Sequence, residues 1–167
     1  MRIKERWENF KLWWKYPFIR PRTMTCDKYC SNFFSYTLLH SMPEGWLKAF
    51  SIDFCNDLKK ALSGYTRDVR KSFRIYDIKE KYGYLRVSCN WYTPEIDEVI
   101  KKYEKLSRKT CVHCGHKAKW LSKGYVLPFC KECAKRVHNH IKFTPIYRKG
   151  KKNGKNKNNR WINRKTF

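Results

Sequence analysis

Apolar side chains recur at helical spacing close to the start of the chain. Within residues 2–16 they share one face, formed by Ile3, Trp7, Phe10 and Trp14. Pro17 ends the helix that this spacing predicts. A basic helix with tryptophans can lie in a membrane interface. Because Glu5 and Glu8 dilute the polar face, we expect instead that the aromatic face docks on the protein's own core.

The longest amphipathic run follows residues 41–46. Ser41 and Glu44 have the spacing of a capping box, with Pro43 in the first turn. Gly64 ends the run. Between these ends apolar residues repeat three and four positions apart, at Leu47, Phe50, Phe54, Leu58, Ala61 and Leu62. The pattern predicts a core helix, preceded by a short strand over residues 33–39.

Two alternating segments follow, at residues 72–77 and 84–91. They flank residues 79–83, so we expect an antiparallel hairpin with Gly83 in its turn. The second strand directs one set of side chains to the core: Leu85, Val87, Cys89 and Trp91. Its other face carries Tyr84 and Arg86, which can contact nucleic acid or simply face solvent.

Thr93, Pro94 and Glu95 have the order of a helix start. The helix they predict has a buried stripe of Ile96, Val99, Ile100, Tyr103 and Leu106. It leads directly into Cys111, so we expect the next module to pack against the core. The fold class predicted is α+β, a small α-β-β-α core with an appended Cys₄ zinc ribbon and a disordered basic C-terminal tail. The chain is expected to divide into an N-terminal amphipathic helix and loop (residues 1–40), the core (41–110), the zinc ribbon with the helix that follows it (111–147) and the basic tail (148–167).

Two C-x-x-C pairs, separated by 15 residues, carry the clearest chemical signal: Cys111 with Cys114, and Cys130 with Cys133. This spacing is typical of a tetrahedral Zn²⁺ site. Gly115 suits the tight turn after the first pair. Residues 117–129 predict two short strands that turn near residues 122–124, and residues 134–141 predict a helix. Four thiolates leave no open coordination position, so we expect one structural zinc ion and no catalytic residue.

The other cysteines have different interpretations. Cys26 and Cys30, with His40 downstream, leave a second metal site open as an alternative. Cys55 and Cys89 fall on apolar faces and are most simply buried thiols. Disulfides are disfavoured, because residues 1–6 are charged and no apolar segment of a secretory signal follows them.

Charge is concentrated at the two ends of this chain of 167 residues. The formal net charge is +25; residues 1–25 contribute +5 and residues 134–167 contribute +12. Residues 148–160 have almost no apolar content, so we expect them to be disordered. Basic extensions favour polyanionic partners, although an AT-rich genome gives a similar bias towards Lys and Asn. No apolar run approaches the roughly 20 residues that span a bilayer, and a membrane partner is not expected.

Three features together resemble a set of small uncharacterised zinc-ribbon proteins from bacteriophages and bacteria. They are the Gly45-Trp46 start of a helix, the hairpin Lys79-Glu-Lys-Tyr-Gly-Tyr-Leu-Arg86, and the ribbon at residues 111–133. The resemblance covers roughly residues 42–134. It implies a phage context and hence a bacterial cytoplasm, and it assigns no role to the hairpin motif.

Nucleic-acid binding through phosphate contacts is the function that charge and ribbon together favour. The residues expected to make contact are Lys117, Lys119, Lys123, Arg136, Arg148, Lys149, Lys151, Lys152, Arg160, Trp161, Arg164 and Lys165. The alternative is an interaction module that binds and modulates a host nucleic-acid-processing protein, whose acidic surface the basic side chains would attract. A nuclease is the remaining alternative, because residues 138–140 read His-Asn-His. Three consecutive helical side chains point in different directions, however, so we do not expect catalysis.

Overall fold

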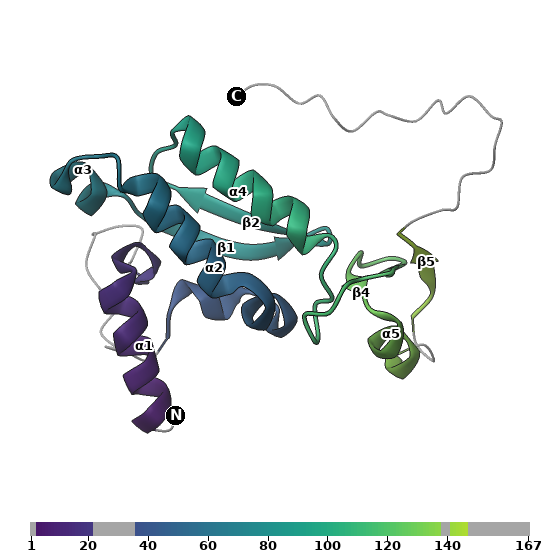
Figure 1. Ribbon diagram of the computed structural model, residues 1–167. Helices are drawn as coiled ribbons and strands as arrows, with labels where there is room; N and C mark the ends of the chain where they lie inside the picture. The colour runs from purple at the N-terminus through teal and green to yellow at the C-terminus, as the bar shows by residue number, and fades with distance from the viewer. Residues whose placement is uncertain (1–2, 22–35, 138–140, 147–167) are drawn as a thin grey trace, which may run out of the picture.

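The computed structural model describes residues 3–21, 36–137 and 141–146. Its helices and small antiparallel sheets make an α+β fold (Figure 1). The helices are α1 (Ile3–Lys15), α2 (Glu44–Leu62), α3 (Arg67–Ser72), α4 (Pro94–Ser107) and α5 (Lys131–Val137), with 3₁₀ turns η1 (Pro17–Ile19) and η2 (Leu38–Ser41). The strands are β1 (Ile75–Lys81), β2 (Tyr84–Cys89), β3 (Trp120–Ser122), β4 (Pro128–Phe129) and β5 (Phe143–Pro145).

Helices α2 and α4 pack on each other and on the β1–β2 hairpin to form the core. The Tyr103 ring of α4 lies 5.6 Å from Phe50 and 5.3 Å from Phe54 of α2, between centroids. Every predicted α2 position from Phe50 to Leu58 in the apolar stripe is buried. The predicted core helix is therefore confirmed, and burial of these large rings is its main source of stability.

The start of α2 differs from the prediction. Its N-cap is Pro43, without a side-chain hydrogen bond. Ser41 instead ends the 3₁₀ turn η2, and the capping box belongs to that turn, between Thr37 and His40. The predicted strand at residues 33–39 is wrong for its described part, because Leu38 and Leu39 belong to η2; residues 33–35 lie outside the described residues.

The hairpin is tighter and starts later than the alternation suggested. Lys79–Lys81 pair with β2 rather than forming the turn. Only Tyr82 and Gly83 turn the chain, with φ values of 54° and 81°. Two successive positive φ values match the twist of the strands, and Gly83 accommodates its own at low cost. Ser72, which the alternation assigned to the first strand, instead ends helix α3.

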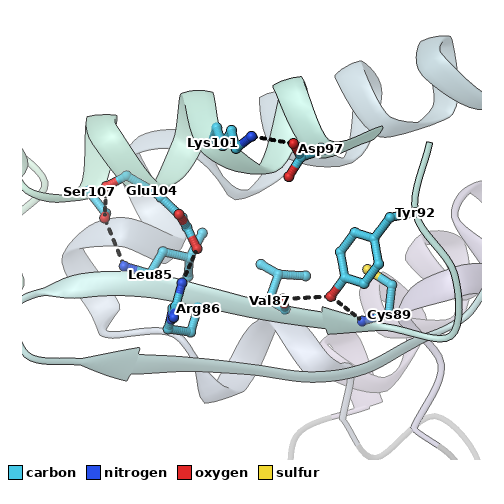
Figure 2. Close-up of polar contacts among 9 residues, drawn as sticks. All are labelled: Leu85, Arg86, Val87, Cys89, Tyr92, Asp97, Lys101, Glu104 and Ser107. Atoms are coloured by element: carbon cyan, nitrogen blue, oxygen red, sulfur yellow. Dashed lines mark hydrogen bonds and ion pairs between the residues drawn. The ribbon is translucent and has the colours of Figure 1, made fainter. Parts of the chain in front are cut away.

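Side chains cover the outer edge of β2, where backbone groups have no neighbouring strand (Figure 2). The Leu85 amide donates to Ser107 Oγ at 2.8 Å. The Cys89 amide donates to the Tyr92 hydroxyl at 3.1 Å, and that hydroxyl donates to the Val87 carbonyl at 3.4 Å. These hydrogen bonds satisfy backbone groups of β2 that would otherwise lack a partner at the edge of the core.

Helix α4 begins where the sequence predicts. Thr93 is its N-cap and accepts a hydrogen bond from the Ile96 amide at 3.4 Å, with Pro94 at the first position. Ile96, Ile100 and Tyr103 are buried as expected. Leu106 is 39% exposed, and Ser107 is buried in its place, because the serine hydroxyl serves the edge of β2.

The face of α1 that packs inward is not the predicted one. Trp7 and Trp14 are 58% and 76% exposed, whereas Trp13 and Tyr16 are buried. The buried pair carries polar atoms that find partners: Trp13 Nε1 donates to the Tyr36 carbonyl at 3.2 Å, and the Tyr16 hydroxyl donates to Asn56 at 2.6 Å. The prediction that the face with Trp7 and Trp14 docks on the core is therefore wrong. Helical spacing alone does not distinguish the two aromatic faces.

Asp57 connects α2 to α4. It accepts hydrogen bonds from Lys102 Nζ at 2.6 Å and from the Tyr103 hydroxyl at 2.9 Å. The bond from Lys102, against the opposing effect of burial, lowers the pKa of Asp57, and Tyr103 lowers it further. The folded state therefore favours the ionised carboxylate.

We expect Asp57→Asn to lower the free energy of unfolding by roughly 1 kcal/mol at neutral pH. Because the folded pKa lies below the unfolded value of about 3.9, the contribution is complete above that value and disappears as the pH falls through the folded pKa. Urea unfolding at pH 7 and in acid measures the difference. Asp53→Asn, at an exposed position of the same helix, is the control and should change stability little. A pH-independent effect of Asp57→Asn would contradict this role.

Candidate metal centre

Four cysteine sulfurs converge at one point of the ribbon. The Sγ atoms of Cys111, Cys114, Cys130 and Cys133 all lie within 4.8 Å of one another. Cys114 and Cys130 are the close pair, at 3.5 Å. Sulfurs about 2.3 Å from a central ion form a tetrahedron with edges of about 3.8 Å. The cluster therefore has the donor type, number and spacing to hold a metal ion.

The first cysteine pair is shaped by a turn of backbone hydrogen bonds. The Cys111 amide donates to the His116 carbonyl at 2.8 Å, and the Gly115 amide donates to the Cys111 carbonyl at 3.1 Å. Gly115 has φ of 79°, as its place after the pair predicted. The turn folds the chain back so that both sulfurs face the same side.

The second pair lies at the start of α5. Cys130 precedes the helix, and Cys133 lies in its first turn. The Cys133 amide points at Cys130 Sγ, 3.4 Å away. We predicted a helix over residues 134–141; it begins earlier, at Lys131, because the C-x-x-C spacing itself fits one helical turn. Residues 138–140, including the His-Asn-His sequence, lie outside the described residues.

Three of the clustered thiols have shifted pKa values, and the shifts differ in direction. Burial raises the pKa of Cys114, but the His116 backbone and the neighbouring sulfurs outweigh it and lower that pKa to about 6. Burial and the sulfur neighbours raise the pKa of Cys133, and burial also raises that of Cys130. Four adjacent thiolates would need a positive charge at their centre, of the kind that a metal cation provides.

A three-stranded sheet with the order β4-β3-β5 supports the centre. Strands β3 and β4 are the predicted pair, with Trp120 opposite Phe129. Strand β5 was not predicted. It pairs Trp120 with Pro145, and its Phe143 ring lies 5.3 Å from Phe129. Three residues ending in proline carry too weak a pattern to identify a strand from sequence.

The ribbon packs directly on the core, as the short connection from α4 predicted. The Gly45 amide at the start of α2 donates to the Val112 carbonyl at 2.8 Å. The Trp46 indole donates to the Thr110 carbonyl at 2.9 Å. A second contact joins the β1–β2 hairpin to the ribbon. The hydroxyl of Tyr125, between β3 and β4, donates to Glu80 of β1. The orientation of the cysteine turn is thus determined by the first turn of α2.

The predicted nucleic-acid contacts divide into two groups. Lys117, Lys119, Lys123 and Arg136 are exposed on the ribbon. The remaining predicted contacts lie in residues 148–165, outside the described residues. On the hairpin, the Tyr84 ring makes cation–π contacts with two guanidiniums, those of Arg86 and Arg108, whose Cζ atoms lie 5.3 Å and 4.9 Å from its centroid. Arg86 also pairs with Glu104 at 3.1 Å, as Figure 2 shows, which reduces its value as a phosphate contact.

The other cysteines are outside this cluster. Burial raises the pKa of both the Cys55 and the Cys89 thiols to about 12, as the interpretation of inert thiols requires. Cys89 is only half-buried, however. Cys26 and Cys30 lie outside the described residues. Nδ1 of His40 accepts from the Thr37 amide at 3.0 Å, so that nitrogen already has a structural partner.

Comparisons with protein-family models, curated proteins and solved structures find no match to this chain. Within the described ranges, none of the helices has the length and apolarity needed to cross a bilayer.

We expect the purified protein to hold one metal ion per chain and Cys130→Ser to lose it. Chelation of the ion should lower the thermal unfolding midpoint by at least about 5 °C, because the ion binds only the folded state. Elemental analysis and calorimetry make the two measurements. Cys89→Ala, outside the cluster, is the control and should keep the full metal content. Retention of stoichiometric metal by Cys130→Ser would overturn the ligand set.

We expect Gly45→Ala to destabilise the protein by about 1–3 kcal/mol. A Cβ at this position would lie 2.2 Å from the Cys111 carbonyl oxygen and 2.6 Å from the Gly115 nitrogen, both backbone atoms. The matched control is Gly64→Ala, where the added carbon has no neighbour within 4 Å. Denaturant unfolding compares the two. Equal stability of the two variants would show that α2 and the cysteine turn can move apart at Gly45 without loss of stability.

Proposed function

We propose that the cysteine cluster holds a structural Zn²⁺ ion and that the ribbon binds nucleic acid through its phosphates, without catalysis. Four sulfur ligands are typical of structural zinc, and they leave no position for an activated water. The exposed basic side chains around the cluster are the observation on which the second part depends.

The ribbon surface carries a large excess of positive charge. Between residues 108 and 137 there are eight lysines and arginines and one acidic residue, Glu132. All eight basic side chains are exposed. A Zn²⁺ ion with four thiolates adds about two negative charges, which leaves the surface strongly cationic. Such a surface attracts phosphates and releases their counterions.

Two of the lysines are held in a defined geometry. Lys117 and Lys119 flank the buried Ala118, whose amide donates to the Lys109 carbonyl at 2.7 Å. The Lys119 amide donates to the Phe129 carbonyl at 2.8 Å. Since both lysines rise from a fixed backbone, we infer that they contact successive phosphates. Lysine recognises phosphate as a point charge, so we expect little sequence preference.

A protein-interaction module is the second candidate. Trp7 and Trp14 are exposed on α1, and tryptophan is enriched at the energetic centres of protein interfaces. In this version the same cations attract an acidic host surface. The bacterial and phage context that the resemblance implies fits either candidate, and it remains a prediction.

We expect binding of labelled single-stranded DNA and RNA to fall steeply between low and moderate salt. Lys117→Gln with Lys119→Gln should reduce the slope of log affinity against log salt by about 2, one for each lost phosphate contact. Fluorescence anisotropy of the full chain measures this slope. Truncation after residue 147 in the same assay measures how much of the affinity for nucleic acid the basic C-terminal residues contribute.

The matched control removes the same charge from α4, with Lys101→Gln and Lys105→Gln, both exposed. We expect its slope to stay close to that of the original protein. An affinity independent of salt would contradict phosphate binding. A host protein captured equally well after nuclease treatment, with no titratable binding of DNA or RNA, would favour the interaction module.

A further inference from the structure

A cationic pocket lies on the core, separate from the ribbon. Its volume is about 570 Å³, within the range of about 300–1,000 Å³ for small-molecule sites. It forms where η1, the end of α2 and helix α3 meet, at the side of the molecule opposite α5 (Figure 1). Seven of its twelve lining residues are basic and none is acidic: Lys15, Arg20, Lys59, Arg67, Arg70, Lys71 and Arg74.

The floor of this cationic pocket is apolar. Phe18, Leu62 and Phe73 line it and are 6%, 3% and 1% exposed. The Phe18 and Phe73 rings pack edge to face, with centroids 5.8 Å apart. The floor is thus part of the core, so it keeps its shape when the rim changes. A ligand here meets an apolar base and a charged rim.

Backbone carbonyls hold two of the guanidiniums in place. Arg20 Nε donates to the Trp13 carbonyl at 3.0 Å. Arg74 Nη1 donates to the Phe73 carbonyl at 3.0 Å, and also to that of Lys71. These bonds fix the positions of the two guanidiniums, so the positive charge that they add to the lining of the pocket is held in place.

Four cations of the rim are not neutralised by the protein around them. Lys59, Arg67, Arg70 and Lys71 are exposed, and none of the four takes part in an ion pair within the described residues. Like charges around one pocket repel, and physiological salt screens them only over about 8 Å. A bound polyanion would remove this repulsion. A single carboxylate, as in a fatty acid, carries too little charge for these four cations.

We propose that this cationic pocket binds a nucleoside di- or triphosphate group, with the phosphates on the Arg67–Lys71 rim and the nucleoside over the apolar floor. Two sources carry this chemistry: a free nucleotide and the 5′-triphosphate end of an RNA strand. The site is independent of the ribbon surface, and either can fail without the other.

Calorimetric titration of the full chain in magnesium-free buffer tests the proposal. ATP should bind in a 1:1 ratio, and more tightly than AMP or inorganic tripolyphosphate. Arg67→Gln with Arg70→Gln should weaken ATP binding at least about tenfold, because it removes two charge-assisted contacts. Lys59→Gln with Lys71→Gln is a second variant, in case the first perturbs α3. Lys101→Gln with Lys105→Gln on α4, the matched control, should bind ATP as the original protein does.

A 10-nucleotide RNA with and without a 5′-triphosphate separates the two sources. Preference for the triphosphate end that is lost in the Arg67/Arg70 variant assigns the site to strand ends; equal binding of both RNAs with retained ATP binding assigns it to free nucleotides.

Three results would overturn the proposal. They are tripolyphosphate binding as tightly as ATP, the same ATP affinity in both rim variants as in the α4 control, and no ATP binding together with rim-dependent binding to phosphatidylglycerol vesicles. The last would indicate a lipid surface. Loss of the nucleotide signal with intact salt-dependent binding of nucleic acid would leave the ribbon proposal standing.

Discussion

The close approach of two backbones at Gly45 is the constraint on which the arrangement of this protein depends. The first turn of α2 lies against the turn that carries Cys111 and Cys114, with a hydrogen bond from Gly45 to Val112 and no room for a side chain. The helix that forms the centre of the core therefore also positions the sulfur cluster. Formation of the cluster and folding of the core are coupled through this contact, so a metal ion that binds the cluster stabilises both.

Two cationic surfaces result from this architecture, at opposite ends of the described structure (Figure 1). One is the ribbon, whose lysines rise from a backbone fixed by the cysteine turns. The other is the pocket between α1, α2 and α3, whose floor belongs to the aromatic core. Both place exposed positive charge on a well-packed support, which reduces the ordering cost of binding an anion. The first suits a long phosphate chain, and the second suits a compact group with several charges.

The sequence carried strong signals for some of these features. Three- and four-residue spacing gave α2, the Thr93-Pro94 pair gave the start of α4, and the cysteine spacing gave the cluster. Where two solutions had equal periodicity, the wrong one was chosen: residues 3–15 have aromatic side chains on both faces, and hydrogen bonds of Trp13 and Tyr16 decide between them. Short elements such as α3 and β5 depend on tertiary contacts that a local pattern does not contain. The pocket could not be predicted, because its cations come from three separate segments, residues 15–20, 59–63 and 67–74.

The outer edge of β2 has a consequence for how this protein meets other molecules. Ser107 already engages the Leu85 amide, and Tyr92 already engages the Cys89 amide and the Val87 carbonyl. An incoming extended peptide would have to break these bonds before adding a strand there, so recognition by strand addition at β2 is blocked. The same arrangement keeps the two-stranded sheet from propagating into intermolecular ladders, which is a safeguard for a small hairpin whose inner face is strongly apolar.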